Sequence, residues 1–323
     1  METGYTFIKP RVAIVRKRKL YVWTRIHEVA MRMTPECVPC LIRRVLFEAE
    51  EVDGQASVKA VKNASKMLGE LFTDDCCSAS VATEVHRETY RLLRSKDPYA
   101  RLKRRSNDVV LDIYPSAERF VKRSKDPLRD AFLCAVVGNV LDFGIGTGFD
   151  DPEKLRKHFK GLLQEGLGHD DTPKIKRLLK KAEKVVYLGD NCGEIVLDRL
   201  ALKELKKSDV HLTLVVKQDA ILTDATLKDI EGLGMEKIVD EIVEAPGFAV
   251  GIDLDSIRGE FGKLLEDANL IVAKGMANFE SLSETDLAPI AYLLRTKCSP
   301  VANAMGLKKD INAVKLFEKR VRR

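Results

Sequence analysis

The fold is decided by one stretch of the chain, KVVYLGDNCGE at residues 184–194. Its first half, Val185 to Leu188, is a short β-branched and apolar run with charge before it and Gly189 after it, which is typical of a buried strand. From Glu194 to Lys206 apolar residues recur at helical spacing. A strand, a glycine-flanked turn and a helix in succession indicate the first unit of an α/β sheet.

Further strand-like runs follow this unit, at residues 211–216, 238–243, 270–273 and 290–294. Stretches with helical spacing, such as residues 257–266, separate them. The alternation predicts an α/β fold, with a mostly parallel, Rossmann-like sheet flanked by helices on both faces. The last residues, 310–323, are expected to form an amphipathic helix, because their terminal Arg and Lys suit the negative end of a helix dipole.

The residues before the sheet have a helical pattern. From Thr34 to about Ala182 apolar residues recur every three or four positions, and Asp-Pro pairs at 97–98, 126–127 and 151–152 mark helix starts. We expect about six helices. The predicted organisation is therefore a basic extension at 1–32, an all-helical domain at 33–182 and an α/β domain at 183–323.

The positive charge of the chain lies in one segment. The 323 residues carry a net charge of +6, and residues 1–33 alone account for it. This segment ends at Met31 and Met33, and we favour an over-called translation start over a basic arm for nucleic acid or lipid and over a targeting peptide. A nucleic-acid partner is disfavoured because nothing in the rest of the chain extends the patch. No apolar run is long enough to cross a membrane.

Seven cysteines, an odd number without regular spacing, favour a reducing cytoplasm over a disulfide framework. Cys37 and Cys40 have the CxxC spacing of half a zinc site or of a redox dithiol. A thiol-based redox or zinc-binding protein is thus the alternative function. It is the weaker one, because no second CxxC completes a four-ligand site.

Polar residues follow three of the expected strands, at the sheet edge where ligands bind in open α/β folds. Asp190 and Asn191 come after the first strand, Asp224 after the second and Lys274 after the fourth. Taken singly, Asp190, Asn191 or Asp224 is equally explained as a helix cap. Together they offer oxygen ligands for a hard divalent cation and an ammonium for phosphate.

Oxygen ligands without histidine favour Mg²⁺ or Mn²⁺ over a catalytic zinc. Such a site suits hydrolysis of a phosphate ester, with Lys274 balancing charge on the phosphoryl oxygens. A kinase is disfavoured, because the chain contains neither a GxxxxGK[ST] loop nor a kinase glycine-rich loop.

These residues resemble the damage-control phosphatase family, also known as domain of unknown function 89. The resemblance covers about residues 34–308. It extends to the archaeal and bacterial branch with an N-terminal CxxC, here Cys37 and Cys40. The motifs that carry it are GDNCGE at 189–194, KGMANFE at 274–280, DPY at 97–99 with Lys103 and Asn107, and GNVLD at 138–142.

The resemblance implies a metal-dependent phosphatase acting on small phosphorylated metabolites, such as sugar phosphates or damaged phosphometabolites, with Mn²⁺, Ni²⁺, Co²⁺ or Mg²⁺. It implies Asp190, Asn191 and Asp224 as metal ligands and Lys274 as the lysine that contacts phosphate. The catalytic candidates are Asp190, Lys274 and Asn278. Candidates for substrate contact are Gly193, Glu194, Asn139, Asp142 and Glu280, of which Asn139 and Asp142 could equally cap helices.

Overall fold

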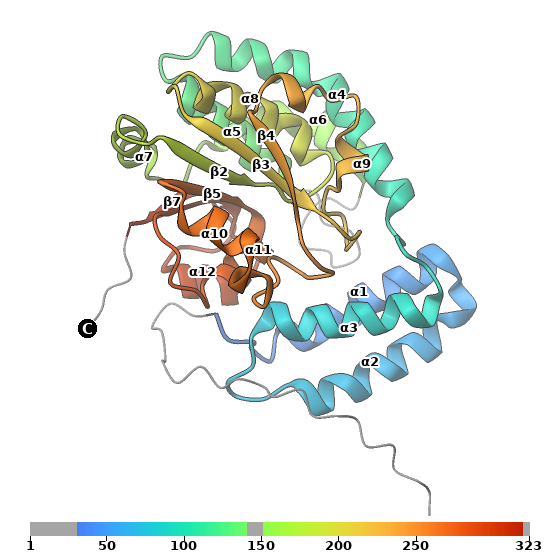
Figure 1. The fold of residues 1–323 in the computed structure, drawn as a ribbon. Coiled ribbons are helices and arrows are strands. Elements are labelled where there is room, and N and C mark those ends of the chain that lie inside the picture. The colour runs from blue at the N-terminus through green and yellow to red at the C-terminus, as the bar shows by residue number, and fades with distance from the viewer. Residues whose placement is uncertain (1–30, 141–150, 319–323) are drawn as a thin grey trace, which may run out of the picture.

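A computed structural model describes residues 31–140 and 151–318 (Figure 1). Six α-helices come first in this described part: α1 (Cys37–Val52), α2 (Ser57–Leu71), α3 (Ser78–Leu93), α4 (Ala100–Lys122), α5 (Pro127–Gly138) and α6 (Pro152–Glu165). Two of the expected helix starts are confirmed. Asp126 accepts a hydrogen bond from the backbone of Arg129 before α5, and Asp151 accepts one from the backbone of Glu153 before α6.

The rest of the chain forms the sheet and the helices that connect its strands. The strands are β1 (His169–Asp170), β2 (Lys184–Leu188), β3 (His211–Lys217), β4 (Glu241–Ala245), β5 (Leu270–Lys274), β6 (Ile290–Arg295) and β7 (Asn312–Phe317). Between them lie α7 (Thr172–Leu179), α8 (Glu194–Lys206), α9 (Leu227–Ile230), α10 (Glu260–Glu266), α11 (Gly275–Leu282) and α12 (Ser299–Met305). The strand order is β1-β7-β6-β5-β2-β3-β4, and only β6 and β7 pair antiparallel.

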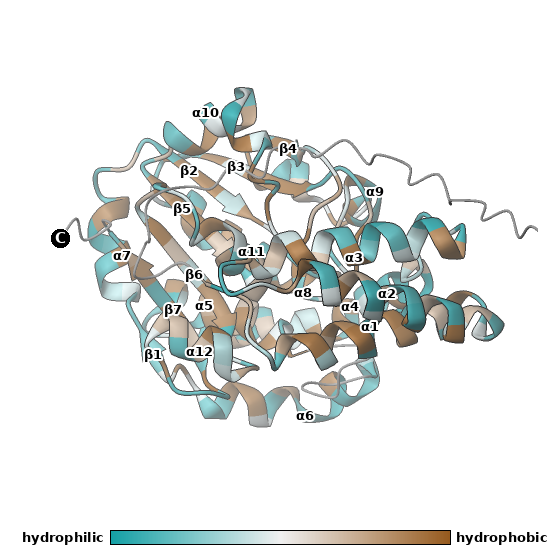
Figure 2. Cartoon of the chain, turned by 90° about the horizontal axis from the view of Figure 1, so that it is seen from below, coloured by the Kyte–Doolittle hydropathy of each residue, from teal (hydrophilic) through white to brown (hydrophobic). Residues whose placement is uncertain are grey.

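The expected α/β fold is confirmed, and both faces of the sheet are covered. Along β2, Val185 and Tyr187 join a core that contains α4, α5 and α8, whereas Val186 and Leu188 join a second core with α10, α11 and α12. Successive side chains of a strand point to opposite faces, so one strand supplies both cores. Figure 2 shows hydrophobic colour concentrated on the strands between these helix layers.

The structure corrects the sequence-based expectations at three places. The expected C-terminal helix is wrong over its described part, since β7 pairs with β6 and buries Val314 and Leu316; residues 319–323 lie outside the described residues. Six residues are too few to distinguish an amphipathic helix from a strand by periodicity alone. The strand expected at 238–243 is instead β4 at Glu241–Ala245, and the region expected to be wholly helical contains the two-residue strand β1.

Helix α5 belongs to the N-terminal helical region, yet it packs against α8, β6 and β7. From Ala131 to Gly138 every residue of α5 is buried. The predicted division of the chain at residue 182 stays a prediction, and the two regions share one continuous hydrophobic core.

Of the predicted basic extension at 1–32, the structure describes only the last two residues, Met31 and Arg32. Met31 is buried, and its backbone N–H donates to Ser283 Oγ at 3.2 Å, while Arg32 forms an ion pair with Glu284 at 3.1 Å. Residues 1–30 lie outside the described residues. Within 31–140 and 151–318, none of the helices has the length and apolar character needed to span a bilayer.

Candidate active site

Two loops meet at the carboxyl edge of the sheet and bring Asp190 and Asn191, after β2, beside Asp224, after β3. Asn191 and Asp224 form an isolated antiparallel bridge. The backbone N–H of Cys192 donates to Thr223 O at 2.7 Å, and that of Ala225 donates to Asp190 O at 2.8 Å. Main-chain hydrogen bonds therefore fix the two loops to each other.

None of the three polar residues caps a helix. The residue before α8 is Gly193, with φ of 81°, and no side chain caps that helix. The residue before α9 is Thr226, which forms a reciprocal capping box with Asp229. The alternative explanation of Asp190, Asn191 and Asp224 as capping residues is therefore not what the structure shows.

Two amide groups hold the carboxylate of Asp190. Asp190 Oδ2 accepts hydrogen bonds from Asn139 Nδ2 at 3.0 Å and from Asn191 Nδ2 at 2.5 Å. The same two amides donate to Glu194 Oε2, at 2.6 and 3.2 Å respectively. Thr223 Oγ1 donates to Asn191 Oδ1 at 2.5 Å, which fixes the other end of that amide.

The electrostatics of the two carboxylates favour a nearby cation. Burial, and then the charges of Asp224 and Glu194, raise the pKa of Asp190 well above its ordinary value. Burial also raises the pKa of Asp224, although the nearby Lys217 acts in the opposite direction; its Nζ lies 3.5 Å from Asp224 Oδ2. Negative charge at this edge is unfavourable until something positive offsets it.

The residues present fit an oxygen-ligated divalent cation. Two buried amide oxygens near this edge, Asn139 Oδ1 and Asn278 Oδ1, have no hydrogen-bond partner among the described residues. The NH₂ group of Asn139 donates to Asp190, and that of Asn278 donates to Gly189 O. Among the described residues no three His, Cys, Asp or Glu side chains are grouped to hold a metal. The expected ligands Asp190, Asn191 and Asp224 include only two residues of these types, because the third is an asparagine. Two carboxylates and one amide oxygen are nevertheless donors that hard cations prefer.

Lys274 lies wholly inside the protein. Its ammonium donates to Ala135 O at 3.1 Å, to Asp198 Oδ1 at 2.8 Å and to Glu194 Oε1. Burial acts to lower the pKa of Lys274, but the two carboxylates outweigh it and the pKa is raised. All three ammonium protons thus have partners within the protein.

Asp198 makes the unfolding free energy of the protein depend on pH. Burial outweighs the charge of Lys274 and raises the pKa of Asp198 from 3.8 to about 7. Between these two values the native state holds more protons than the unfolded state, so Asp198 makes the unfolding free energy fall as pH rises.

We expect Asp198→Asn to reduce the loss of unfolding free energy between pH 4.5 and pH 7.5, measured by urea denaturation of metal-free protein. Asp240 is an exposed carboxylate whose pKa is lowered by a hydrogen bond from the Leu212 backbone and by Lys206, so it titrates below this window. Asp240→Asn should therefore leave the loss unchanged. Equal losses in wild type and Asp198→Asn would contradict the expectation.

Helix α11 approaches the carboxylate of Asp190 through a glycine. Gly275 has φ of 73°, and a Cβ atom there would lie 1.8 Å from Asp190 Oδ2. One turn later Asn278 Nδ2 donates to Lys274 O at 2.7 Å and to Gly189 O at 3.2 Å. Glycine is therefore required at 275 for both the backbone conformation and the close contact.

Sequence reasoning passed over Lys217 and Lys297. Lys217 ends β3 and donates to Ala249 O at 3.1 Å, and Lys297 follows β6 with only 6% of its surface exposed. The charge of Lys297 acts to lower the pKa of Asp190. Both lie at the carboxyl ends of strands, so the rule that selected Lys274 would have selected them too.

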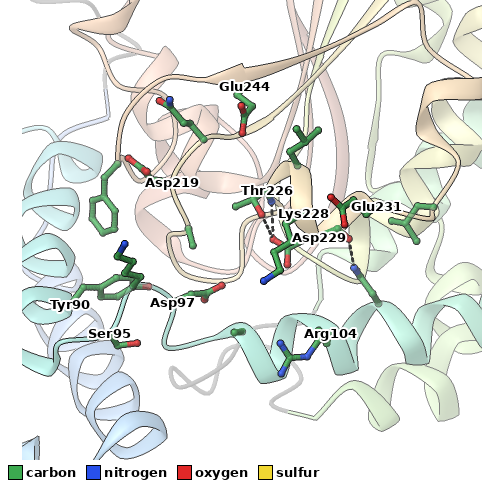
Figure 3. A pocket seen from close by; sticks show the side chains of 18 of the residues that line it. Tyr90, Ser95, Asp97, Arg104, Asp219, Thr226, Lys228, Asp229, Glu231 and Glu244 are labelled. Carbon is green, nitrogen blue, oxygen red and sulfur yellow. Dashed lines mark hydrogen bonds between the residues drawn. The ribbon is translucent and has the colours of Figure 1, made fainter.

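A cleft of about 1340 Å³ borders the site, between the α3–α4 turn and the loops after β3 and β4 (Figure 3). Asn107 lines the cleft and connects it to the site: its Oδ1 accepts from Gly193 N at 2.6 Å, and its Nδ2 donates to Asp229 O at 2.8 Å. Tyr90 also lines it and accepts a hydrogen bond from the backbone of Leu222, a residue in the left-handed region. Helices α3 and α4 thus hold both loops of the site.

The remaining candidates lie elsewhere or outside the described residues. Glu280 Oε2 accepts from Ser78 on α3 at 2.8 Å, and burial raises the pKa of Glu280. Cys37 and Cys40 lie in the first turn of α1, half-buried and not joined in a disulfide. Asp142 lies outside the described residues.

The fold and site match one class of enzyme. A family model described as the damage-control phosphatase ARMT1-like domain matches residues 33–312. The chain belongs to the damage-control phosphatase ARMT1-like family, and it is accordingly a phosphatase.

Relatives are similar over most of the chain. A damage-control phosphatase of Archaeoglobus fulgidus is 40% identical over 290 residues, which cover 89% of this chain and 100% of the relative. A damage-control phosphatase of Pyrococcus horikoshii, PH1575, is 28% identical over 86% of this chain and 96% of the relative. The crystal structure of a DUF89 family protein, also PH1575, has a TM-score of 0.78 at 27% identity, over 90% of this chain and 99% of that one.

Proposed function

We propose that this phosphatase is metal-dependent and hydrolyses phosphate monoesters of small metabolites, such as sugar phosphates or damaged phosphometabolites. The observation that carries the proposal is the meeting of the buried carboxylates of Asp190 and Asp224 at one sheet edge, through the Asn191–Asp224 bridge. Similarity to two archaeal damage-control phosphatases supports it.

In this proposal Asp190, Asn191 and Asp224 hold one divalent cation, Mn²⁺, Ni²⁺, Co²⁺ or Mg²⁺. The raised pKa values of the two carboxylates support a cation here, as do the oxygens of Asn139 and Asn278, which have no partner within residues 31–140 and 151–318. When bound, the cation supplies positive charge that polarises the phosphoryl group.

The protein's own groups then bind and orient the ester. Gly275 lets helix α11 lie directly against the carboxylate of Asp190, and Asn278 lies one turn along the same helix. We assign phosphate binding to Lys297, which follows β6 at the carboxyl edge of the sheet and whose charge acts on Asp190. The leaving group extends toward the cleft beside Asn107.

We also propose the finer assignments that the sequence suggested: the archaeal and bacterial branch with the CxxC pair Cys37 and Cys40, and a cytoplasmic location. The seven cysteines, all within the described residues, form no disulfide there, which supports a reducing compartment.

The test is turnover of p-nitrophenyl phosphate by chelator-treated protein, with and without added Mn²⁺, Ni²⁺, Co²⁺ or Mg²⁺. We expect at least one cation to restore activity and Asp224→Ala to lose it. Cys37→Ser should retain activity, whereas the thiol-based alternative requires the opposite pair of outcomes. Turnover that is unaffected by chelation or by Asp224→Ala would overturn the proposal.

A further inference from the structure

We propose that Glu194 is a positioning residue for the metal site, and that Lys274 acts through it. The carboxylate of Glu194, fixed by the ammonium of Lys274, sets which end of the Asn139 and Asn191 amides faces the cation. This inference rests on the proposed function and assigns roles to two side chains that the cation itself would not touch.

The amides of Asn139 and Asn191 share one orientation in the site. An asparagine offers a cation its oxygen, never its NH₂ group, so a flipped side chain is no ligand. Both NH₂ groups donate to the same pair of acceptors, Asp190 Oδ2 and Glu194 Oε2. Because the nitrogen of each amide faces these two carboxylate oxygens, the oxygen of each amide points away from them.

Glu194 gives the two amides an acceptor that the cation does not share. Asp190 would also bind the cation, and a carboxylate shared with a metal is a weaker acceptor for an amide. Glu194 is fully buried, and the NH₂ groups of Asn139 and Asn191 both bond to its Oε2. Glu194 Oε2 therefore remains an acceptor for both amides whether or not a cation is bound to Asp190.

The buried Lys274 is the partner that holds Glu194 in place. A carboxylate without exposure to water is costly unless it is paired and hydrogen-bonded. Lys274 is 0% exposed, and its ammonium donates hydrogen bonds to Glu194, to Asp198 and to Ala135 O. The ammonium of Lys274 holds the Glu194 side chain in place, so that Glu194 Oε2 stays in position to accept hydrogen bonds from both amides.

The experiment measures binding of Mn²⁺ alone, by isothermal titration calorimetry, to wild type and to Glu194→Gln. Glutamine has nearly the same shape, but it presents either an oxygen or an NH₂ group, so the orientation is no longer forced. We expect the Mn²⁺ dissociation constant to rise about 10–100-fold, the usual effect of losing a group that orients a ligand. The melting temperature of the metal-free variant is recorded in parallel.

The matched control is Glu48→Gln, at an equally buried carboxylate that pairs with His86 Nδ1 at 2.8 Å in the N-terminal helices. It should lower the melting temperature while leaving the dissociation constant within about twofold, which separates loss of stability from loss of positioning. If Glu194→Gln does not fold, Asn139→Ala tests the same amide clamp.

The outcomes are distinguishable. An unchanged dissociation constant in the variant that folds overturns the positioning role, while the proposed function stands. Failure of the wild type to bind Mn²⁺ overturns the proposed function and this inference with it.

Discussion

Asp190→Asn should abolish measurable Mn²⁺ binding and reduce kcat/KM for an aryl phosphate by about 10²–10³-fold or more, the range for losing one major electrostatic group of an active site. The change preserves shape and removes the carboxylate that lies between two amides and faces Asp224. Burial and neighbouring carboxylates disfavour its charge, so the metal-free variant should be at least as stable as wild type. Calorimetry, steady-state kinetics and thermal melting measure the three quantities.

The control for this variant is Asp267→Ala. Asp267 is an exposed carboxylate just before β5, at the amino edge of the sheet, and its pairing with Lys184 at 3.6 Å is exposed to water. Such a pair contributes little stability. Full Mn²⁺ affinity and activity in Asp190→Asn would remove this residue from the site. Loss accompanied by a lower melting temperature would show that the variant fails through its fold.

Gly275→Ala should damage both stability and activity, although it adds a single methyl group. The φ of 73° is costly for alanine by about 1–2 kcal/mol. In addition, the new Cβ would lie 1.8 Å from Asp190 Oδ2 and 2.4 Å from Asp190 Cγ, so the carboxylate must move. We expect loss of Mn²⁺ affinity together with reduced unfolding free energy in urea.

The matched variant is Gly69→Ala. Gly69 lies inside α2, and a Cβ atom there meets nothing within 4 Å. The same substitution at that position should stabilise the protein by about 0.5–1 kcal/mol and leave metal binding unchanged. Wild-type affinity and stability in Gly275→Ala would show that the close approach of α11 to Asp190 has no functional role.

The parts of the fold that could be predicted from the sequence are those whose signals are local. Residues 184–194 contain strand, turn and helix signals in order, and they fold as β2, a turn at Gly193 and α8. The rule that strand ends share one edge then predicted that Asp190 and Asp224 would lie close together. No knowledge of distant packing was needed for either inference.

The errors and omissions depend on distant contacts. The residues of β7 become a strand because β6 offers hydrogen bonds, a fact that the segment itself does not contain. The surroundings of Lys274 come from α5 and α8, and the close contact that requires glycine at 275 comes from Asp190, in the loop after β2. Position at a strand end indicated that Lys274 lies near the site, but not that its ammonium faces inward.

The burial of α5 has a consequence for synthesis of the protein. Eight consecutive residues of this helix are buried, and its partners include β7, which is made only after residue 312. At about 5–20 residues per second, a ribosome needs roughly 9–35 s to travel from α5 to β7. During that interval the apolar surface of α5 lacks the strand that later covers part of it. We therefore expect the nascent chain to bind chaperones near the exit of the ribosomal tunnel.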